Sequence, residues 1–508
     1  MSDKRSRNAQ LNIITSLAFE IITLLCGLLI PRFMIGAFGS EVYGATASIA
    51  QFLAYIALLE GGIGGVARAA LYRPLADGDT HKLSMLTVEI KKFFYKIAYV
   101  FGAYVIVLAC VFKRMSDLEA LDWISTAALV IVISISTFAQ YFIGISNSIL
   151  LQAAQKSYVT NIVSLAGTIL NTAMVLLLIR FDCGIITVKL VSSCVFALKP
   201  IAMWMYVRKH YKLTKCEISE PQLKQKTTAL GQHLAYFLHS NMDIVLLTWL
   251  SDLASVAVYT VYNMVVSGIQ KLTASFTSGM EALFGDMLAK NEKDGLNKTF
   301  GYYETLISTV SGILFSITAV MIVPFVKIYT DGIDDADYIA PLFAILLVVS
   351  ALLYSLRMPY HAAVMAAGHF KQTRFAAYGE AIINLILSIL LIKSFNLVGV
   401  IIGTIVATLY RFIYYVIYLS KNILNRNALL FAKRIAVNSS AFAVSFLLGR
   451  IISQCFEINN FGIWIMVAIC VAVVISLTTL LINGLAYHKD YKDFFGILTK
   501  KIKHGRKP

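Results

Sequence analysis

The sequence predicts an all-α polytopic membrane protein with about fourteen transmembrane helices. They are expected to form two six-helix lobes related by a parallel repeat, followed by two C-terminal helices. The prediction rests on composition, on a series of apolar runs and on an internal repeat. Of the 508 residues, 58% are hydrophobic and only 14% are charged, whereas soluble proteins carry about 25% charged residues. A soluble fold of this length could not bury so much apolar surface.

The apolar runs set the number and order of the helices. A span needs about 20 apolar residues, and runs of this length are centred near residues 22, 54, 101, 134, 168, 195, 239, 269, 315, 350, 384, 408, 442 and 473. The first run follows the basic stretch MSDKRSRN, as the apolar core of a signal peptide would. Because it contains Glu20, is long enough to span and lacks a small-residue cleavage site, we interpret it as a retained first span.

Basic residues indicate the orientation of the spans. Of the 44 Lys and Arg residues, 31 fall at the two termini and in alternate loops, seven fall in the remaining loops and six lie within spans. Because cytoplasmic loops are enriched in Lys and Arg, we expect both termini in the cytoplasm. The same distribution accounts for the net charge of +16, so nucleic acid is not expected as a partner.

An internal repeat divides the chain. The segment 151–180 aligns without gaps on 364–393, at an offset of 213 that places Asn171 on Asn384. Upstream, EVYG at residue 41 is similar to AVYT at residue 257. An even number of spans separates the copies, so both lobes should keep one orientation. The expected parts are an N-terminal lobe, a cytoplasmic linker, a C-terminal lobe and two extra helices with a basic tail, at residues 1–210, 211–226, 227–425 and 426–508.

Basic residues within the spans are candidate functional residues, because a charge at the bilayer centre costs about 2.5–3.5 kcal/mol even on insertion scales. Those that lie deep in their spans are interpreted as lining a water-filled cavity: Lys199, Lys271, Arg357 and Arg411. Tyr354 and His361 lie on the helix of Arg357. These six residues and Arg68 are the predicted substrate-binding residues, since basic, aromatic and hydroxyl groups together suit an anionic ligand that carries sugars.

Acidic residues within the spans allow two interpretations. Glu20, Glu60 and Asp243 are candidates for ion coupling, but they and Glu380 could equally neutralise the basic residues, and the sequence leaves the pairing open. The stretch LLEGGIGGVAR (58–68) joins two of the candidates, Glu60 and Arg68, through four glycines. It is either a close-packed helix end, with Arg68 among the lipid headgroups, or a flexible gate at which Arg68 meets the entering substrate.

Other clusters of reactive side chains favour no metal or cofactor. The acidic stretch TDGIDDADY (330–338) could hold a metal, but a solvated loop that caps the next helix is the favoured interpretation. The seven cysteines contain no CxxC pair, so neither a disulfide framework nor a zinc site is expected. No cofactor and no catalytic residue are predicted.

Three functional classes differ in the features that they require. A membrane glycosyltransferase or polymerase usually needs an acidic site in a substantial outer loop, and the outer loops here are short, without H-E-x-x-H or G-x-S-x-G motifs. A channel is expected to show oligomeric symmetry and a re-entrant loop. Two pseudo-symmetric lobes in one chain favour a transporter that works by alternating access, not an enzyme.

Several segments resemble one transporter family. PRFMIGAFGSEVYG (31–44) and the glycine-rich GGIGGVAR that follows look like the first hairpin of bacterial polysaccharide flippases. AAGHFKQTRFAAYGEAIINLILS (366–388) and VGVIIGTIVATLYR (398–411) resemble their second-lobe pattern. The chain thus resembles the flippases of lipid-linked oligosaccharides for O-antigen and other polysaccharides. These belong to the multidrug/oligosaccharidyl-lipid/polysaccharide exporter superfamily, and the resemblance covers nearly the whole chain.

This resemblance implies a function. The substrate would be an oligosaccharide linked by pyrophosphate to undecaprenol, moved from the inner to the outer leaflet for synthesis of O-antigen, capsule or exopolysaccharide. The implied partners are this substrate, membrane lipids and the polysaccharide polymerase machinery. An ion-coupled exporter of drugs or toxins, from the same superfamily, is the alternative, and a polytopic glycosyltransferase or polymerase is the alternative from another class.

Overall fold

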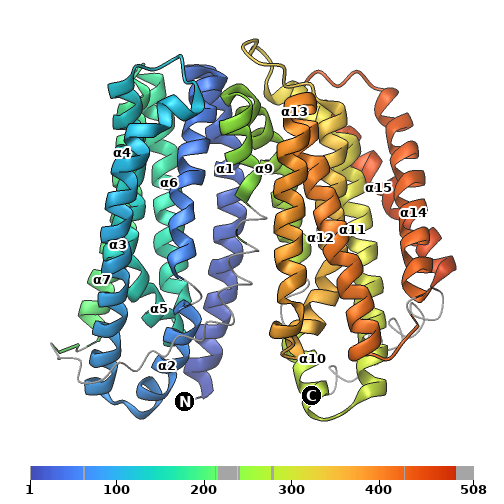
Figure 1. Ribbon diagram of the computed structural model, residues 1–508, viewed down its shortest axis with the longest axis horizontal. Helices are drawn as coiled ribbons and strands as arrows, with labels where there is room; N and C mark the ends of the chain where they lie inside the picture. The colour runs from blue at the N-terminus through green and yellow to red at the C-terminus, as the bar shows by residue number, and fades with distance from the viewer. Residues whose placement is uncertain are drawn as a thin grey trace. The chain divides into compact units, whose positions relative to one another are not determined.

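The computed structural model describes residues 2–60, 63–211, 213–214, 237, 241–275, 280–427 and 429–487 (Figure 1). These residues form helices and short connections, and no strand occurs among them. Three features singled out in the sequence lie outside the described residues: Gly61, the linker from residue 215 onwards and the tail beyond residue 487.

The chain forms two compact units. Unit 1 comprises Met1–Thr260 together with Gly332–Ala336, and unit 2 comprises Val261–Asp331 and Asp337–Pro508. The helices described in unit 1 are α1 (Ser2–Ala54), η1 (Tyr55–Glu60), α2 (Ile63–Asp77), α3 (Thr80–Ser116), α4 (Trp123–Ala139), η2 (Gln140–Gly144), α5 (Ile145–Ala153), α6 (Ser157–Arg180), α7 (Ile185–His210) and a short helix, Asn241–Leu250. Helix α9 (Leu253–Ser275) begins in unit 1 and ends in unit 2. Unit 2 also contains α10 (Met280–Ala289), α11 (Lys293–Tyr329), α12 (Pro341–Ala366), α13 (Phe370–Asn422), α14 (Leu429–Gln454) and α15 (Phe461–Ala486).

The helices have the length and composition of membrane spans. Eleven helical stretches in the described residues are long and apolar enough to cross a membrane. Two of them are broken: α1 at Gly39, with φ 81°, and α13 at Asn396, with φ 46°. Each therefore holds two of the predicted spans, and the short apolar helix Asn241–Leu250 falls on the run centred near residue 239. The predicted fold class, an all-α polytopic membrane protein, is confirmed.

The break in α13 folds this helix back on itself. Asn396 has a positive φ of 46° with ψ −124°, and Asn adopts positive φ more often than most other residues. The two halves then approach at glycines spaced as GxxxG. A Cβ atom on Gly399 would lie 2.4 Å from the carbonyl oxygen of Leu391, and one on Gly403 would lie 2.4 Å from Oγ of Ser388. The close approach brings residues near 380 and near 411 to neighbouring positions.

The bounds of several helices recur at the same offset of 213 residues as the sequence repeat. Helices α3 and α11 begin and end 213 residues apart, as do the ends of α5 and α12 and the starts of α6 and α13. Two short helices that the apolar runs did not predict, α2 and α10, precede α3 and α11. The two copies therefore agree in the bounds of these described helices.

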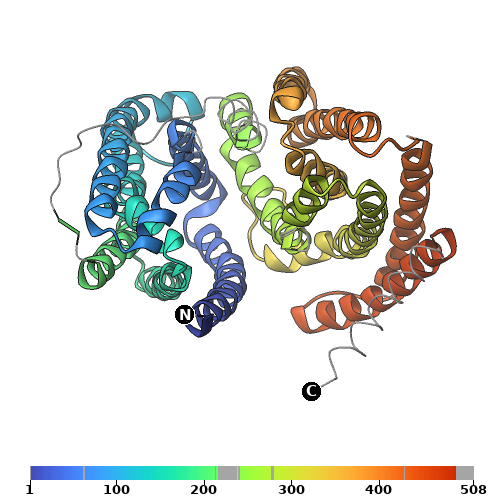
Figure 2. The ribbon, with the colours of Figure 1, turned by 90° about the horizontal axis from the view of Figure 1, so that it is seen from below.

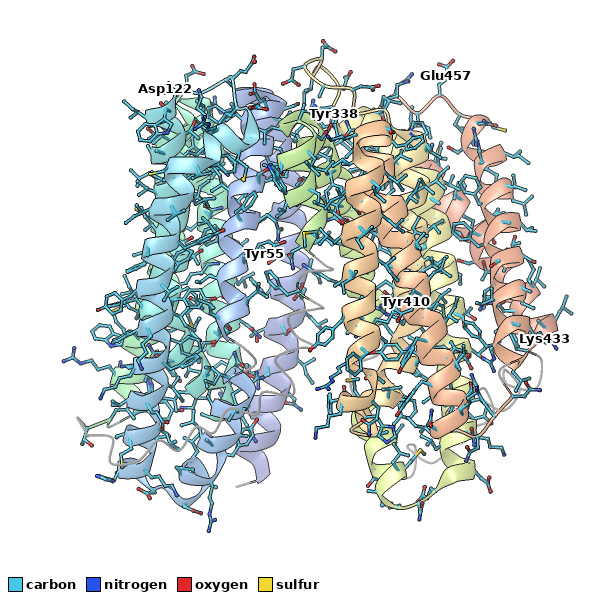
Figure 3. All side chains as sticks on the ribbon, in the orientation of Figure 1. Tyr55, Asp122, Tyr338, Tyr410, Lys433 and Glu457 are labelled. Atoms are coloured by element: carbon cyan, nitrogen blue, oxygen red, sulfur yellow. The ribbon has the colours of Figure 1, made fainter. Side chains whose placement is uncertain are left out.

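Within unit 2, α12 packs against both α11 and α13 (Figure 1). Helices α14 and α15 pack on each other and on α11, at one side of the unit (Figure 2). Lys433 lies near the start of α14, and Glu457 lies in the connection between α14 and α15 (Figure 3). Within unit 1, α1 packs on α6, and α4 packs on α3 and α7.

Candidate functional site

A buried triad of charges lies in unit 2. Arg357 of α12 and Arg411 of α13 each donate from Nη1 to a different carboxylate oxygen of Glu380, also in α13. The side chains of both arginines are 3% exposed and that of Glu380 is 0% exposed. The fold-back of α13 brings Glu380 and Arg411 together, and the packing of α12 on α13 adds Arg357. We call Arg357, Glu380 and Arg411 the central triad.

Aromatic side chains surround the central triad. The guanidinium carbon of Arg357 lies 4.9 Å from the ring centroid of Tyr354. Arg411 donates from Nη2 to the hydroxyl of Tyr415 at 2.9 Å, and the His361 ring lies 5.7 Å from the Tyr415 ring. The structure thus brings together four predicted substrate-binding residues: Tyr354, Arg357, His361 and Arg411.

The central triad carries an excess of positive charge. One carboxylate faces two guanidiniums, which cannot lose their charge in proteins, so the net charge is +1. The Nε atoms of Arg357 and Arg411 are buried and have no hydrogen-bond partner in the described structure. A buried charge without a compensating partner is unfavourable: removing one partner of a buried ion pair costs about 3–5 kcal/mol for this reason. An anion beside the arginines would supply the missing charge and acceptors.

A second cluster lies in the same unit and was missed by sequence reasoning. Glu304 of α11 accepts from Arg426, which follows α13, at 3.0 Å, and its Oε2 lies 3.3 Å from Nη1 of Arg434 in α14. The hydroxyl of Tyr360 also donates to Glu304. We call Glu304, Tyr360, Arg426 and Arg434 the peripheral cluster. Glu304 lies within an apolar run, in GYYETLISTV, and this signal could have identified it.

Helix α12 carries residues of both groups. Arg357 belongs to the central triad, and Tyr360, three positions later, belongs to the peripheral cluster. Residues three apart lie on neighbouring positions of one helix face. Because Arg434 also lies over the ring of Tyr487, directly after α15, at 5.2 Å, the peripheral cluster connects α12 with α11, α14 and the end of α15.

Two of the predicted ion-coupling acids lie in unit 1 and bind tyrosines. Glu60 accepts from the hydroxyl of Tyr141, and Asp243, which is buried, accepts from the hydroxyl of Tyr259 at 3.0 Å. Glu60 forms no ion pair among the described residues. An acid held by a neutral donor, as Glu60 is, can gain or release a proton without breaking a salt bridge.

Two predicted basic residues in unit 1 lie in different surroundings. Lys199 is half-buried, and its ammonium lies 4.1 Å from the ring centroid of Phe196. Its stem occupies the space over Gly167, where a Cβ atom would lie 2.4 Å from Cε of Lys199. Arg68, on α2, is exposed and donates to Oε1 of Gln152 at 2.6 Å.

The remaining predicted residues are exposed. Glu20 of α1, in unit 1, and Lys271 of α9, in unit 2, form no ion pair with any residue that the structure describes. Within unit 2, Lys271 does not pair with Glu380 of the central triad.

The acidic stretch 330–338 binds backbone and hydroxyl groups. Asp335 accepts from the backbone N–H of Ser40 at 2.5 Å and from its hydroxyl at 2.6 Å. Asp337 accepts from the backbone N–H of Ile339 at 2.9 Å. In the part of the chain that is described, no group of three His, Cys, Asp or Glu residues has the arrangement of a metal site.

Comparison with known proteins identifies the fold. No family model and no curated protein matches the sequence. The lipid II flippase MurJ, in an inward closed conformation, matches with a TM-score of 0.65 and 15% identity over 94% of this chain and 99% of MurJ. The MATE multidrug transporter DinF-BH matches with a TM-score of 0.57 and 16% identity over 81% of this chain and 95% of its own. An inward-facing MATE transporter of the MOP superfamily matches with a TM-score of 0.55 and 12% identity over 79% and 98%. This chain therefore has the fold of the MurJ and MATE transporters, as the resemblance implied.

Proposed function

We propose that this protein is a flippase that moves a pyrophosphate-linked oligosaccharide lipid from the inner to the outer leaflet by alternating access. The observation that carries the proposal is the central triad, in which two buried arginines share the single carboxylate of Glu380. An anionic ligand would compensate this buried net positive charge. The fold shared with MurJ, a lipid II flippase, supports a lipid-linked substrate.

The chemistry of the arginines fits a pyrophosphate group. A guanidinium binds phosphate oxygens through two parallel N–H donors, and such charge-assisted hydrogen bonds are about twice as strong as neutral ones. The orphaned Nε atoms of Arg357 and Arg411 would supply donors without breaking the bonds to Glu380. Tyr354 and His361 would contact the sugars beside the pyrophosphate, since both flank the two arginines.

Other predicted residues would act at earlier or later stages of transport. Arg68, Lys199 and Lys271 would contact the pyrophosphate or acidic sugars as the substrate enters or leaves. Glu20, Glu60 and Asp243 would couple an ion to transport, and the tyrosine partners of Glu60 and Asp243 are compatible with a proton.

The cellular setting belongs to the same proposal. The distribution of Lys and Arg favours both termini in the cytoplasm, and the resemblance to bacterial polysaccharide flippases favours the bacterial inner membrane. Residues 1–210 and 227–425 would be the two lobes that rock during transport, without catalysis by the chain itself. The product would be used by a polysaccharide polymerase, for O-antigen, capsule or exopolysaccharide.

An ion-coupled exporter of cationic compounds is the second candidate. The observation in its favour is that Glu60 has only a tyrosine donor, and no cation, among its described partners. The fold shared with MATE multidrug transporters agrees with it. The two candidates differ in the sign of the cargo charge, so removing positive charge from the central triad separates them.

The experiment uses purified protein in liposomes that contain a fluorescent undecaprenyl-pyrophosphate oligosaccharide. Flipping is measured as the fraction of label that becomes accessible to a quencher on the opposite side. The proposal expects flipping by the native chain and loss of flipping in Arg357→Gln and Arg411→Gln. A matched control is Arg73→Gln, which removes an exposed arginine paired with Asp77. Transport of a cationic dye in place of the lipid would favour the exporter.

A further inference from the structure

Three tyrosines of α13 form a row between the two halves of this helix. Tyr410, Tyr414 and Tyr418 recur every four residues after the break at Asn396, which is the spacing of one helix face. The rings of Tyr414 and Tyr418 stack, with centroids 6.0 Å apart and an interplanar angle of 8°. We call Tyr410, Tyr414 and Tyr418 the tyrosine row.

Two of the three hydroxyls in the tyrosine row are bound by the half of α13 that precedes the break. The hydroxyl of Tyr414 donates to the carbonyl of Gln372 at 3.2 Å, and the hydroxyl of Tyr418 shares a hydrogen bond with Nδ1 of His369 at 3.0 Å. The hydroxyl of Tyr410 forms no hydrogen bond with any residue that the structure describes. Because a polar group without a partner is unfavourable in a bilayer, this hydroxyl is suited to a ligand.

Tyr410 lies beside the central triad, on its exposed side (Figure 3). It directly precedes Arg411, and its ring lies over Gly379, which directly precedes Glu380. A Cβ atom on Gly379 would lie 2.8 Å from both Cε1 and Oη of Tyr410. Tyr410 is 37% exposed, whereas the side chains of Arg411 and Glu380 are 3% and 0% exposed. Since Gly379 has no side chain, the ring of Tyr410 covers the backbone next to the triad.

The exposed residues near Tyr410 in the sequence of α13 are apolar. Val406 and Ile413, on the same half of the helix, are 41% and 46% exposed, and Ile382, on the other half, is 55% exposed. Exposed apolar side chains on a membrane-spanning helix are typical of a surface that contacts lipid. The unpaired hydroxyl of Tyr410 therefore lies where an apolar surface meets a buried charged group.

We propose that the face of α13 around Tyr410 binds the junction between the prenyl chain and the pyrophosphate of the cargo. This step rests on the proposed function, because a cargo anchored in the bilayer must bring its phosphates to Arg411 while its chain stays in lipid. The ring of Tyr410 would contact the first isoprene units. Its hydroxyl would donate to a phosphate oxygen, and a charged acceptor strengthens such a bond.

A second exposed tyrosine provides a matched control. Tyr99, on α3 in unit 1, is 67% exposed and likewise forms no hydrogen bond within the described part of the chain. The central triad belongs to unit 2. Substitution of Tyr99 thus removes an exposed ring and hydroxyl without changing the proposed binding face.

The first test separates the contribution of the ring from that of the hydroxyl. Farnesyl pyrophosphate and inorganic pyrophosphate are titrated into the purified protein in detergent. Tyr410→Phe should weaken binding of both by about threefold, for one lost hydrogen bond. Tyr410→Ala should weaken farnesyl pyrophosphate by about a further tenfold, through lost apolar contact, and inorganic pyrophosphate no further. Tyr99→Ala should change neither affinity. Native affinity for farnesyl pyrophosphate in both Tyr410 variants would overturn the proposal.

The second test locates the lipid directly and keeps an aromatic ring at the position. The photoreactive variants Tyr410→p-benzoylphenylalanine and Tyr99→p-benzoylphenylalanine are illuminated in nanodiscs that contain radiolabelled undecaprenyl pyrophosphate. We expect labelled protein at position 410, suppressed by excess unlabelled undecaprenyl pyrophosphate but not by undecaprenol, and little label at position 99. Equal labelling at the two positions, or equal suppression by undecaprenol, would mean ordinary contact with lipid and would contradict the proposal.

The two proposals can fail separately. If position 410 is labelled as expected but the native chain does not flip the fluorescent undecaprenyl-pyrophosphate oligosaccharide, the binding face stands and the proposed cargo fails. If the native chain and Tyr410→Ala flip this lipid equally well and position 410 is not labelled, the cargo stands and the binding face fails.

Discussion

Arg357 and Arg411 lie on different helices and bind opposite oxygens of the same buried carboxylate, that of Glu380. Because of this arrangement, removing an arginine and removing the carboxylate change the buried net charge in different ways. Removing one arginine leaves a neutral ion pair, whereas removing the carboxylate leaves two buried positive charges. The variants described below use this difference.

Substitutions in the central triad should separate binding from stability. Arg357→Gln should weaken binding of a pyrophosphate lipid by about 1.5–3 kcal/mol, the value of charge-assisted hydrogen bonds, with little loss of stability. Glu380→Gln should keep the binding but lower the free energy of unfolding by about 3–5 kcal/mol. Binding is measured by titration in detergent and unfolding by denaturant. Equal loss of binding in both variants would indicate that geometry, not charge, is what matters.

The peripheral cluster should act as a stabilising contact. Glu304→Gln leaves Arg426 and Arg434 without their shared carboxylate, so the free energy of unfolding should fall by about 3–5 kcal/mol. Lys290→Ala removes an exposed pair with Asp286 and should change stability by less than about 1 kcal/mol. Both changes are read from thermal unfolding of the purified proteins. A Glu304→Gln protein as stable as the Lys290→Ala protein would contradict this role.

The fold-back of α13 should depend on its two glycines. Gly399→Ala and Gly403→Ala each place a methyl group 2.4 Å from another atom, so each should destabilise the protein by about 1–3 kcal/mol through overpacking. Gly484, in α15, has no atom within 4 Å of the added position. Gly484→Ala should therefore stabilise its helix by up to about 1 kcal/mol. Chemical denaturation compares the three variants, and equal stability of all three would refute a tight fold-back.

The acid Glu60 should serve transport more than stability. Glu60→Gln keeps an oxygen that can accept from Tyr141, so its unfolding free energy should change by less than about 1 kcal/mol. If Glu60 takes up a proton during transport, the variant should transport at a rate that no longer responds to a pH gradient across the liposome. A response equal to that of the native chain would exclude Glu60 as the coupling residue.

The sequence predicted the fold well because the signals were local and repeated. Apolar runs of the right length marked the spans, and the offset of 213 recurs in the bounds of α3 and α11. The apolar runs predicted separate spans on the two sides of each break, centred near 22 and 54 and near 384 and 408, but did not identify Gly39 and Asn396 as the residues at which the helices break. A conformation of one residue leaves little trace in a window of about 20.

The sequence predicted the two arginines of the central triad but not how they pair. The cost of charge in a membrane singled out Arg357 and Arg411, and both lie in the central triad. The pairing of Arg411 with Glu380 depends on the fold-back of α13 and that of Arg357 on the packing of α12 against α13, neither of which is revealed by spacing along one helix. The described hydrogen-bond donors to Glu60 and Asp243 are tyrosines. A tyrosine in a span is uncharged and common, so its position in the sequence did not mark it as a partner.

The most direct test of the proposed function is the flipping assay with fluorescent undecaprenyl-pyrophosphate oligosaccharide in liposomes. The account predicts flipping by the native chain, with a loss of at least about tenfold in Arg357→Gln and Arg411→Gln, since about 1.5–3 kcal/mol of charge-assisted binding is removed, and no loss in Arg73→Gln. Full flipping by both central-triad variants would contradict the claim that buried positive charge in unit 2 binds the cargo.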